Sequence, residues 1–483
     1  MSVHPIDSRI FGPAWGRDEL RVLFEDEGRT RGWCEVLAVL AEEEGALGII
    51  PPDAAAEVAG VLRGDLPDLD EIRRGSVETG HSLLGLIRAQ ARRCRGDAGE
   101  WICYGATVQD VTDSWYARTL VFVADLAAAD LASLEADLLG LVRAHRATPM
   151  LGRTHGQAGL PITFGYKAAV WVDELRRHRV RLAELRPRLR VGQLAGGVGT
   201  LSGYGPRGLE LQARVLARLG LEAPVISWTA ARDRFAELVL WLALVTATLD
   251  RIGHEVYNLQ RSEIGELAEP ATPGDVGSIT MPQKRNPERS EHLGTLARLV
   301  RRDADLMLEA MVGDHERDGR SWKTEWAAIP EACVAGGAAL RIARELVAGL
   351  EVRPEAMLRN LEAWHEPMAG EAVMLALAAL TGKQTAHDRV HAALARARDG
   401  GRPLRDELRD DPGIGGLLPA GDMERLLAAP STGLSEALVD RVLGSLAGSA
   451  PSLGSLAGST SGPGPAPGDG PDPGSASGSA PGA

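Results

Sequence analysis

Long stretches in the middle of the chain carry apolar residues at a helical spacing. Apolar residues recur there every three or four positions, and Arg118–Arg146, for example, contains no proline and only one glycine. Stretches of this kind, about 20 to 30 residues long, form amphipathic helices that pack together. The pattern predicts an all-α protein with a long central helical bundle, built from Arg118–Arg146, Tyr166–Leu185, Ala231–Glu263, Pro287–Met311 and Ile329–Leu350.

Shorter helical patterns flank the bundle on both sides. Residues 1–105 show helices interrupted by prolines, and residues 356–443 form a second set of short helices. We therefore expect an N-terminal helical domain over residues 1–105, the long-helix bundle over 106–355 and a C-terminal helical domain over 356–443. Strand-like alternation is weak and appears only around Gly192–Tyr204.

The last stretch of the chain, residues 444–483, has a different composition. It consists mostly of Gly, Pro, Ser and Ala, and it repeats Ser-Leu-Ala-Gly-Ser at positions 445 and 455. A segment with so few large apolar side chains cannot offset the entropy lost on ordering. The composition predicts a disordered C-terminal tail.

Composition and charge narrow the function classes. The chain has 483 residues, of which 44% are hydrophobic and 25% charged, and its net charge is −13. An acidic balance of this kind disfavours nucleic acid and membrane surfaces as partners. The longest apolar run, Leu238–Leu249, is too short for a membrane span. Four cysteines without a CxxC pair, and an N-terminus without a signal pattern, favour a cytoplasmic location.

A loop rich in glycine and proline leads into the fourth predicted helix. Gly274 and Gly277 give this loop conformational freedom. Ser278 has a hydroxyl that can act as a base if neighbouring groups lower its pKa, and Lys284 is a candidate for that role. Lys284 and Asn286 are also suited to hold a carboxylate. The plainer alternative is a solvated loop before a helix N-terminus. The sequence is Gly277-Ser278-Ile279-Thr280-Met281-Pro282-Gln283-Lys284-Arg285-Asn286-Pro287, closed by Ser290-Glu291.

A second candidate segment, Gly152–Gln157, contains His155 between small residues, where we expect the start of a helix. A lone histidine is more often a structural side chain than a catalytic one. A carboxylate such as Glu291 would orient the imidazole as a general acid. Arg153 and Gln157 are its expected hydrogen-bonding neighbours.

A third candidate segment, Gly105–Ser114, precedes the first long helix. Its Thr and Asp residues are typical N-caps, which is the structural interpretation. The same hydroxyls and amide, placed at a helix N-terminus, also suit an anion. Thr107 and Gln109 are the expected ligands, and Asp110 is the expected structural anchor.

The three segments together closely resemble the fumarase/aspartase superfamily. The loop pattern G-S-x-x-M-P-x-K-x-N-P-x-x-x-E is long and specific, and the resemblance covers residues 5 to 440. Thr79–Ser82 falls where many members carry a substrate-contacting His or Asn. Four further segments are similar to the branch that contains adenylosuccinate lyase and 3-carboxy-cis,cis-muconate cycloisomerase: Gly196–Thr200, Trp228–Arg234, Leu259–Glu266 and Trp322–Trp326.

The resemblance implies a β-elimination beside a carboxylate that gives fumarate from a small dicarboxylate. It implies Ser278 as the base on a flexible loop and His155, oriented by Glu291, as the acid. It also implies a homotetramer whose active sites combine three subunits, and it requires no metal and no organic cofactor. The residues that it places around the substrate are Thr107, Gln109, Thr154, Gln157, Lys284, Asn286, His81 and Arg232.

Three residues, Val108, Ile279 and Gln283, differ from the adenylosuccinate lyase pattern. These differences narrow the range of expected substrates. They favour a small 2-substituted succinate with an amine- or nitrite-type nitrogen leaving group, such as nitrosuccinate. Adenylosuccinate lyase and the cycloisomerase are the alternatives. Retention of His155 favours a lyase over the cycloisomerase, and the presence of Ser278 and His155 disfavours an inert structural relative.

Two other motifs are weak signals. Gly197-Val198-Gly199 with Gly203 resembles a dinucleotide-binding fingerprint, but the last spacing is wrong and no βαβ pattern surrounds it. His387 and His391 have the spacing of a zinc-binding pair, yet Asp388 stands where a zincin has Glu and no third ligand is evident. Neither motif predicts a cofactor or a metal.

Overall fold

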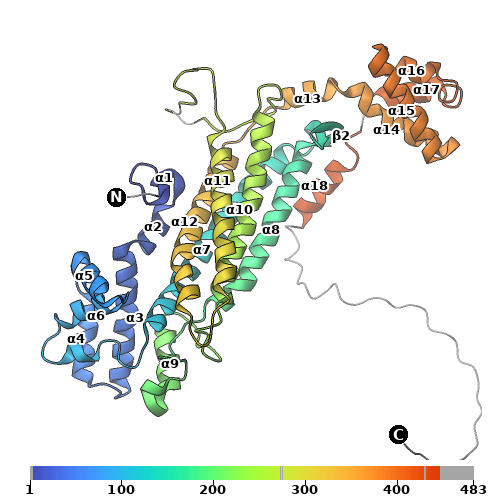
Figure 1. The fold of residues 1–483 in the computed structure, drawn as a ribbon. Helices are drawn as coiled ribbons and strands as arrows, with labels where there is room; N and C mark the ends of the chain where they lie inside the picture. Colours follow the sequence, from blue (N-terminus) through green and yellow to red (C-terminus); the bar gives the residue numbers. More distant parts are fainter. Residues whose placement is uncertain (1–3, 272–273, 275, 429–430, 446–483) are drawn as a thin grey trace, which may run out of the picture.

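The computed structural model describes residues 4–271, 274, 276–428 and 431–445. Five long helices form the centre of the molecule, as the apolar pattern predicted (Figure 1). In α11, for example, Leu293, Leu296, Val300 and Met307 are all buried on one side. The five helices are α7 (Val108–Ala144), α8 (Phe164–Leu189), α10 (Asp233–Gln260), α11 (Glu288–Ala310) and α12 (Gly319–Ala348).

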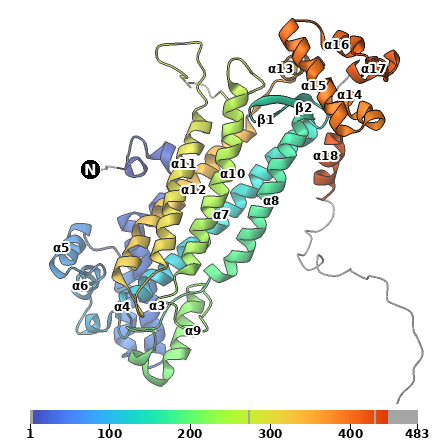
Figure 2. The same cartoon turned by 45° about the vertical axis from the view of Figure 1, so that its right-hand side comes forward.

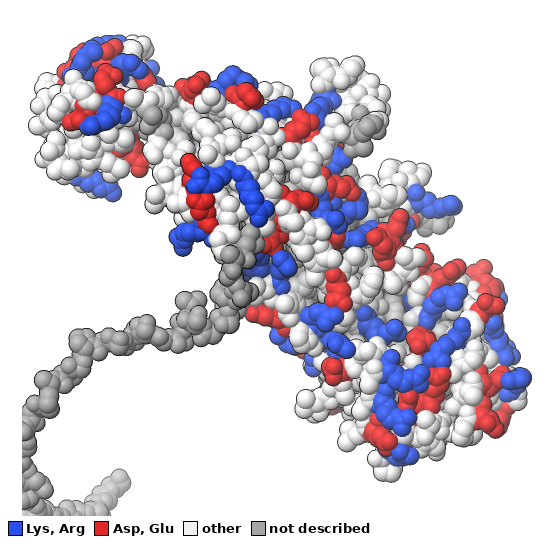
Figure 3. Space-filling view, turned by 180° about the vertical axis from the view of Figure 1, so that it is seen from behind, with Lys and Arg blue, Asp and Glu red and all other residues white. Residues whose placement is uncertain are grey.

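The N-terminal part consists of shorter helices that pack beside the start of α7 (Figure 1). Prolines lie at the starts of its helices; Pro51, for example, directly precedes α4. On the face seen in Figure 3, Lys and Arg are intermixed with Asp and Glu over these helices. The elements are η1 (Pro5–Asp7), α1 (Gly12–Trp15), α2 (Asp18–Phe24), α3 (Asp26–Ala46), α4 (Pro52–Arg63), α5 (Leu69–Thr79), α6 (Leu84–Ala91) and η2 (Ala98–Trp101).

Helices α14 to α17 form a smaller body with its own apolar core, whereas Met357 of α13 packs in the main core (Figure 2). Helix α18 (Ser435–Gly444) returns to the central bundle, where Val439 is buried and Arg146 Nη2 lies 2.6 Å from Asp440 Oδ2. The predicted disordered tail lies outside the described residues from 446 onward. The other helices are α13 (Pro354–Glu362), α14 (His365–Thr381), α15 (Lys383–Gly400), α16 (Leu404–Asp410) and α17 (Ala420–Ala428).

Short strands occur where the sequence pattern did not indicate them. Strands β1 (Pro149–Thr154) and β2 (Gln157–Thr163) form an antiparallel hairpin, and β3 (Leu267–Ala268) pairs with β4 (Glu351–Val352). The segment of weak alternation, residues 192–204, instead runs into the 3-10 helix η3 (Ser202–Arg207), which is followed by α9 (Gly208–Arg218). The expected helix start around His155 is therefore wrong, because that residue lies in the turn of the hairpin.

The bundle separates two groups of predicted site residues by its full length. Helix α7 has 37 residues, so its two ends lie about 55 Å apart. The end that carries the β1–β2 hairpin, the β3–β4 pair and the loop after α10 is called the hairpin end here (Figures 1 and 2). The other end, with the start of α7 and the turn between α11 and α12, is called the opposite end. None of the helices in the described ranges is long and apolar enough to cross a membrane.

One buried carboxyl group in α3 makes stability depend on pH. Glu44 is fully buried and neither of its oxygens has a hydrogen-bond partner in the described part of the chain. Burial raises its pKa to about 9. The native state therefore keeps a proton that the unfolded chain releases at a lower pH, and stability falls as the pH rises between those two pKa values.

We expect the substitution Glu44→Gln to remove this pH dependence. At pH 8 the free energy of unfolding of the variant should rise by on the order of a few kcal/mol, because ionisation of this side chain no longer stabilises the unfolded state. At pH 4 the difference from wild type should be small. Thermal unfolding at both pH values measures the effect. The matched control is Glu43→Gln, which loses the ion pair with Arg214 and should gain nothing.

Candidate active site

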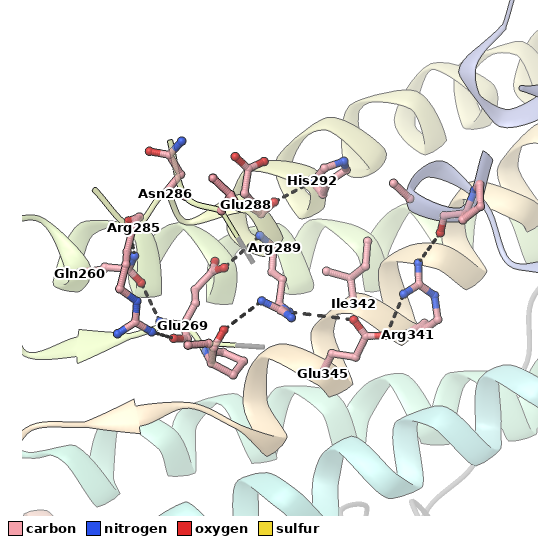
Figure 4. A pocket seen from close by; sticks show the side chains of 16 residues that line it. Gln260, Glu269, Arg285, Asn286, Glu288, Arg289, His292, Arg341, Ile342 and Glu345 are labelled. Carbon is pink, nitrogen blue, oxygen red and sulfur yellow. Dashed lines mark hydrogen bonds and ion pairs between the residues drawn. The ribbon is translucent and has the colours of Figure 1, made fainter. Parts of the chain in front are cut away.

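The stem of the loop that carries Ser278 is fixed by a buried carboxylate. Glu269, just after β3, accepts hydrogen bonds from the backbone N–H of Arg289 at 3.0 Å and of Ser290 at 2.7 Å. A negative charge at this position stabilises the N-terminus of α11. Gln260 Oε1 accepts the N–H of Glu269, and its amide donates to the carbonyl of Arg285. Both sides of the stem are thus tied together (Figure 4).

Ser278 lies beyond this stem. Its hydroxyl oxygen accepts the N–H of Met281 at 3.1 Å, while Ile279 is 97% exposed. Gly277 is required for a steric reason, because a Cβ there would lie 2.1 Å from the carbonyl oxygen of Lys284. Gly274 has a φ of +97°, in the region that favours glycine. Gly274 thus adopts a conformation that favours glycine, and Gly277 is required by the space around it, while the conformational freedom expected of both stays a prediction.

Two cavities flank the stem. One, of about 620 Å³, lies towards α1 and α12 and is lined by Asn286, Glu288 and His292, among others (Figure 4). The other, of about 730 Å³, lies beside β3 and contains Lys284, Asn286 and Glu291 in its lining. The Lys284 ammonium has no ion-pair partner among the described residues. Three predicted site residues therefore share one cavity that has an uncompensated cation.

His155 occupies the tip of the β1–β2 hairpin. His155 and Gly156 have φ values of 54° and 73°, as the two-residue turn between Thr154 and Gln157 requires. The side chains of Thr154, His155 and Gln157 at this tip are exposed. Arg153 does not bond to the imidazole but pairs with the buried Glu266. Among the described residues, His155 makes no hydrogen bond or ion pair, so one chain does not bring it to Glu291.

The third segment is anchored at the opposite end. The carboxylate of Asp110 accepts the N–H groups of Thr107, Ala195 and Gly196 at 3.0, 2.8 and 2.9 Å, as its predicted anchoring role requires. Burial raises the pKa of Asp110 to about 6. Gln109 is fully buried and donates to the carbonyl of Thr229. The loop before α7 is therefore held rigidly against the bundle.

Arg317 is a candidate ligand that the sequence did not reveal. Its Nε donates to Gln109 Oε1 at 2.7 Å. Its Nη2 is buried and has no hydrogen-bond partner in the described part of the chain. A guanidinium with a spare donor beside a helix N-terminus suits an anion. The residue escaped sequence analysis because it lies in a polar run, Asp314–Arg320, that looks like an ordinary solvated turn.

The structure gives Arg232 a different role from the predicted anion ligand. The side chain is 4% exposed and pairs with Asp113 and Glu325. These two carboxylates accept from four of its five N–H donors at 2.6 to 2.9 Å. The carboxylates come from α7 and α12, so their convergence is not visible in the sequence. Arg232 joins two helices rather than facing a substrate.

Replacing Arg232 with methionine should therefore destabilise the protein strongly. The change leaves two buried carboxylates without their cation, which costs about 3–5 kcal/mol in comparable cases. Urea or thermal unfolding measures the loss. The neighbouring Arg234→Met is the control, because Arg234 is partly exposed and donates one hydrogen bond to the carbonyl of Arg188. Equal stability of the two variants would contradict the assignment.

Three other histidines make only local contacts. His81 Nδ1 accepts the N–H groups of Leu83 and Leu84 at 3.3 and 3.2 Å, so it caps the start of α6. His387 and His391 stack with ring centroids 6.0 Å apart. Within the described ranges, no group of three or more His, Cys, Asp or Glu side chains is arranged to hold a metal ion.

The chain is similar to known proteins over most of its length. The family described as "Lyase" matches residues 17–301, and "Adenylosuccinate lyase C-terminus" matches residues 367–442. The N-acetyl-S-(2-succino)cysteine lyase of Dickeya dadantii is 38% identical over 92% of this chain and 98% of its own. The adenylosuccinate lyase of Methanothermobacter thermautotrophicus is 36% identical over the same shares. A fumarate lyase structure from Mesorhizobium sp. BNC1 superposes with a TM-score of 0.81 at 36% identity, covering 89% and 98% of the two chains. The chain belongs to the lyase family and is an enzyme of the fumarase/aspartase superfamily.

Proposed function

We propose that the enzyme releases fumarate from a small 2-substituted succinate by β-elimination. The observation behind this proposal is the cavity beside β3, which is lined by Lys284, Asn286 and Glu291 and by Met281, three residues after Ser278. An ammonium and an amide are suitable donors for a substrate carboxylate. The cavity of about 730 Å³ is also large enough for a substituted dicarboxylate.

The chemistry explains why such donors are needed. The C–H bond beside a carboxylate is weakly acidic, so its removal generates a dianionic aci-carboxylate that preorganised donors must stabilise. Lys284 and Asn286 supply these donors in the proposal, and Ser278 takes the proton. The N–H of Met281, which donates to the Ser278 oxygen, favours the negatively charged form that a base requires.

The leaving group is then protonated by His155. Its imidazole lies at an exposed hairpin tip, free of partners among the described residues. Glu291, exposed at the start of α11, is available to orient an imidazole that comes from another chain. In the proposal Thr154 and Gln157, which are exposed on either side of the turn, contact the substrate in the same site.

We propose that the sites are shared within a homotetramer. Thr107 and Arg317 lie at the opposite end of the bundle from Ser278, and a small substrate cannot span about 55 Å. An antiparallel neighbour would bring the two ends together. Large apolar side chains are exposed along the bundle helices, where such a neighbour would cover them: Phe122 on α7, Val170 on α8 and Leu244 on α10.

We propose a thiol as the first candidate for the leaving group. The relative from Dickeya dadantii is named for an S-(2-succino)cysteine substrate, and it matches nearly the whole chain. A nitrogen leaving group, as in nitrosuccinate, is the second candidate. Relatives named adenylosuccinate lyase, whose substrate carries nitrogen at that carbon, support it at similar identity. The departures at Ile279 and Gln283 speak against a bulky nucleotide substrate.

A substrate panel tests this proposal. Fumarate formation is followed in the ultraviolet with N-acetyl-S-(2-succino)cysteine, S-(2-succino)cysteine, nitrosuccinate, aspartate, adenylosuccinate, argininosuccinate and malate. We expect the highest kcat/KM for a thioether. Preference for nitrosuccinate would replace the thiol by nitrite. Absence of fumarate from every compound would contradict the elimination and favour a cycloisomerase, to be tested with 3-carboxy-cis,cis-muconate.

A further inference from the structure

Two buried carboxylates lie three residues apart between α10 and the Ser278 loop. Glu266 is fully buried and Glu269 is 4% exposed. Glu269 holds the stem of the Ser278 loop through the N-terminus of α11. Glu266 makes none of these contacts. The two carboxylates therefore act on different parts of the hairpin end.

Glu266 ties the hairpin with His155 to the bundle. Arg153 donates to its carboxylate from both terminal nitrogens, Nη1 to Oε2 at 2.9 Å and Nη2 to Oε1 at 2.6 Å. Asn360 of α13 donates to Oε1 at 2.8 Å. Paired hydrogen bonds of this kind fix the orientation as well as the distance of the guanidinium. One carboxylate thus joins β1 and α13 to the segment just before β3.

The hairpin needs such a restraint. It has only two strands, and a two-stranded ribbon is barely stable alone. Its register shifts between Leu151 and Arg153, which marks a bulge directly below the tip. His155 itself has a positive φ, a conformation that a histidine keeps only when its surroundings fix the turn. Arg153 lies on the strand two residues before His155, so its anchorage sets where the tip points.

We propose that Glu266, acting through Arg153, is a positioning residue for His155, whereas Glu269 positions Ser278. The assignment rests on the proposed function, in which His155 protonates the leaving group and Ser278 removes the proton. Substitution of Glu266 then slows the departure of the leaving group. Damage to Glu269 impairs proton removal, which every substrate requires.

The two defects differ in their dependence on the leaving group. A basic alkyl thiolate needs a proton as it departs, whereas an aryl thiolate is a far weaker base and departs without one. The test compares N-acetyl-S-(2-succino)cysteine with an S-aryl analogue, 2-(4-nitrophenylthio)succinate, as substrates of the full-length enzyme. Glu266→Gln and the milder Arg153→Lys are the variants, since lysine keeps the charge but loses the paired hydrogen bonds. Glu269→Gln is the matched control.

We expect Glu266→Gln and Arg153→Lys to lower kcat for the alkyl thioether about tenfold or more, and for the aryl thioether less than about twofold. KM should change little, and Glu269→Gln should slow both substrates by the same factor. Circular dichroism and the oligomer size show that each variant is folded, and Arg153→Lys carries the test if Glu266→Gln does not fold.

Equal slowing of both thioethers by folded Arg153→Lys, or no slowing at all, would overturn the positioning role. If wild type releases no fumarate from either thioether, the proposed function itself fails and the assignment falls with it. The two failures are distinguishable, because the first leaves wild-type turnover intact and the second abolishes the activity on which every comparison depends.

Discussion

Ser278→Ala should lower kcat by about 10²–10⁴-fold, the contribution typical of a general base. The hydroxyl is the group that takes the substrate proton, and alanine offers no substitute. The fold should be unaffected, since the hydrogen bond that the hydroxyl accepts is from Met281 within the same loop. The measurement is fumarate release at saturating substrate, together with helix content and oligomer size.

Thr280→Ala is the control for this prediction. Thr280 is an exposed hydroxyl residue two positions further along the same loop, so its removal perturbs the loop to a similar extent. We expect near wild-type turnover for Thr280→Ala. Undiminished turnover of Ser278→Ala would remove Ser278 as the base and would move the search to other side chains around the cavity beside β3.

Substitution of His155 should cause a loss that grows with the basicity of the leaving group. An amine or an alkyl thiolate needs a proton as it departs, and we expect a fall of about 10²-fold or more for such substrates. Nitrite is a weak base and departs without protonation by a general acid, so the rate of its release should be almost unchanged. Rates of fumarate formation from aspartate-type, thioether and nitro substrates measure the trend.

The choice of variant matters because His155 has a φ of 54°. Alanine is strained in that region, whereas asparagine tolerates it. His155→Asn therefore preserves the turn but supplies no acid. If His155→Ala is slow and His155→Asn is fast, the loss comes from a distorted hairpin rather than from a missing proton donor. The same loss for all leaving groups would also contradict the acid role.

The helical architecture could be predicted because long helices leave an apolar repeat in the sequence. Strands β1 and β2 could not, since each is short and the hairpin contains Gly152, Gly159 and Pro161, residues that obscure an alternating pattern. The His155-Gly156 turn was the available signal: a two-residue connection with glycine between short apolar segments. It was interpreted as the start of a helix.

The site was predictable where neighbours in sequence are neighbours in space. Lys284, Asn286 and Glu291 belong to one loop and helix start, and they do line one cavity. Long-range pairing was not predictable. Arg232 meets its two carboxylates only because α7, α10 and α12 converge, and the spare donor of Arg317 depends on its position beside Gln109. Charged residues in a helix or polar run give no hint of such partners.

The most direct test of the whole account mixes two inactive variants. Ser278→Ala and His155→Asn subunits are dissociated together, reassociated and assayed for fumarate formation. If the base and the acid of one site come from different chains, mixing should restore about a quarter of wild-type activity, because half of the chains supply each intact group. No recovery in properly assembled mixed oligomers would contradict the shared site.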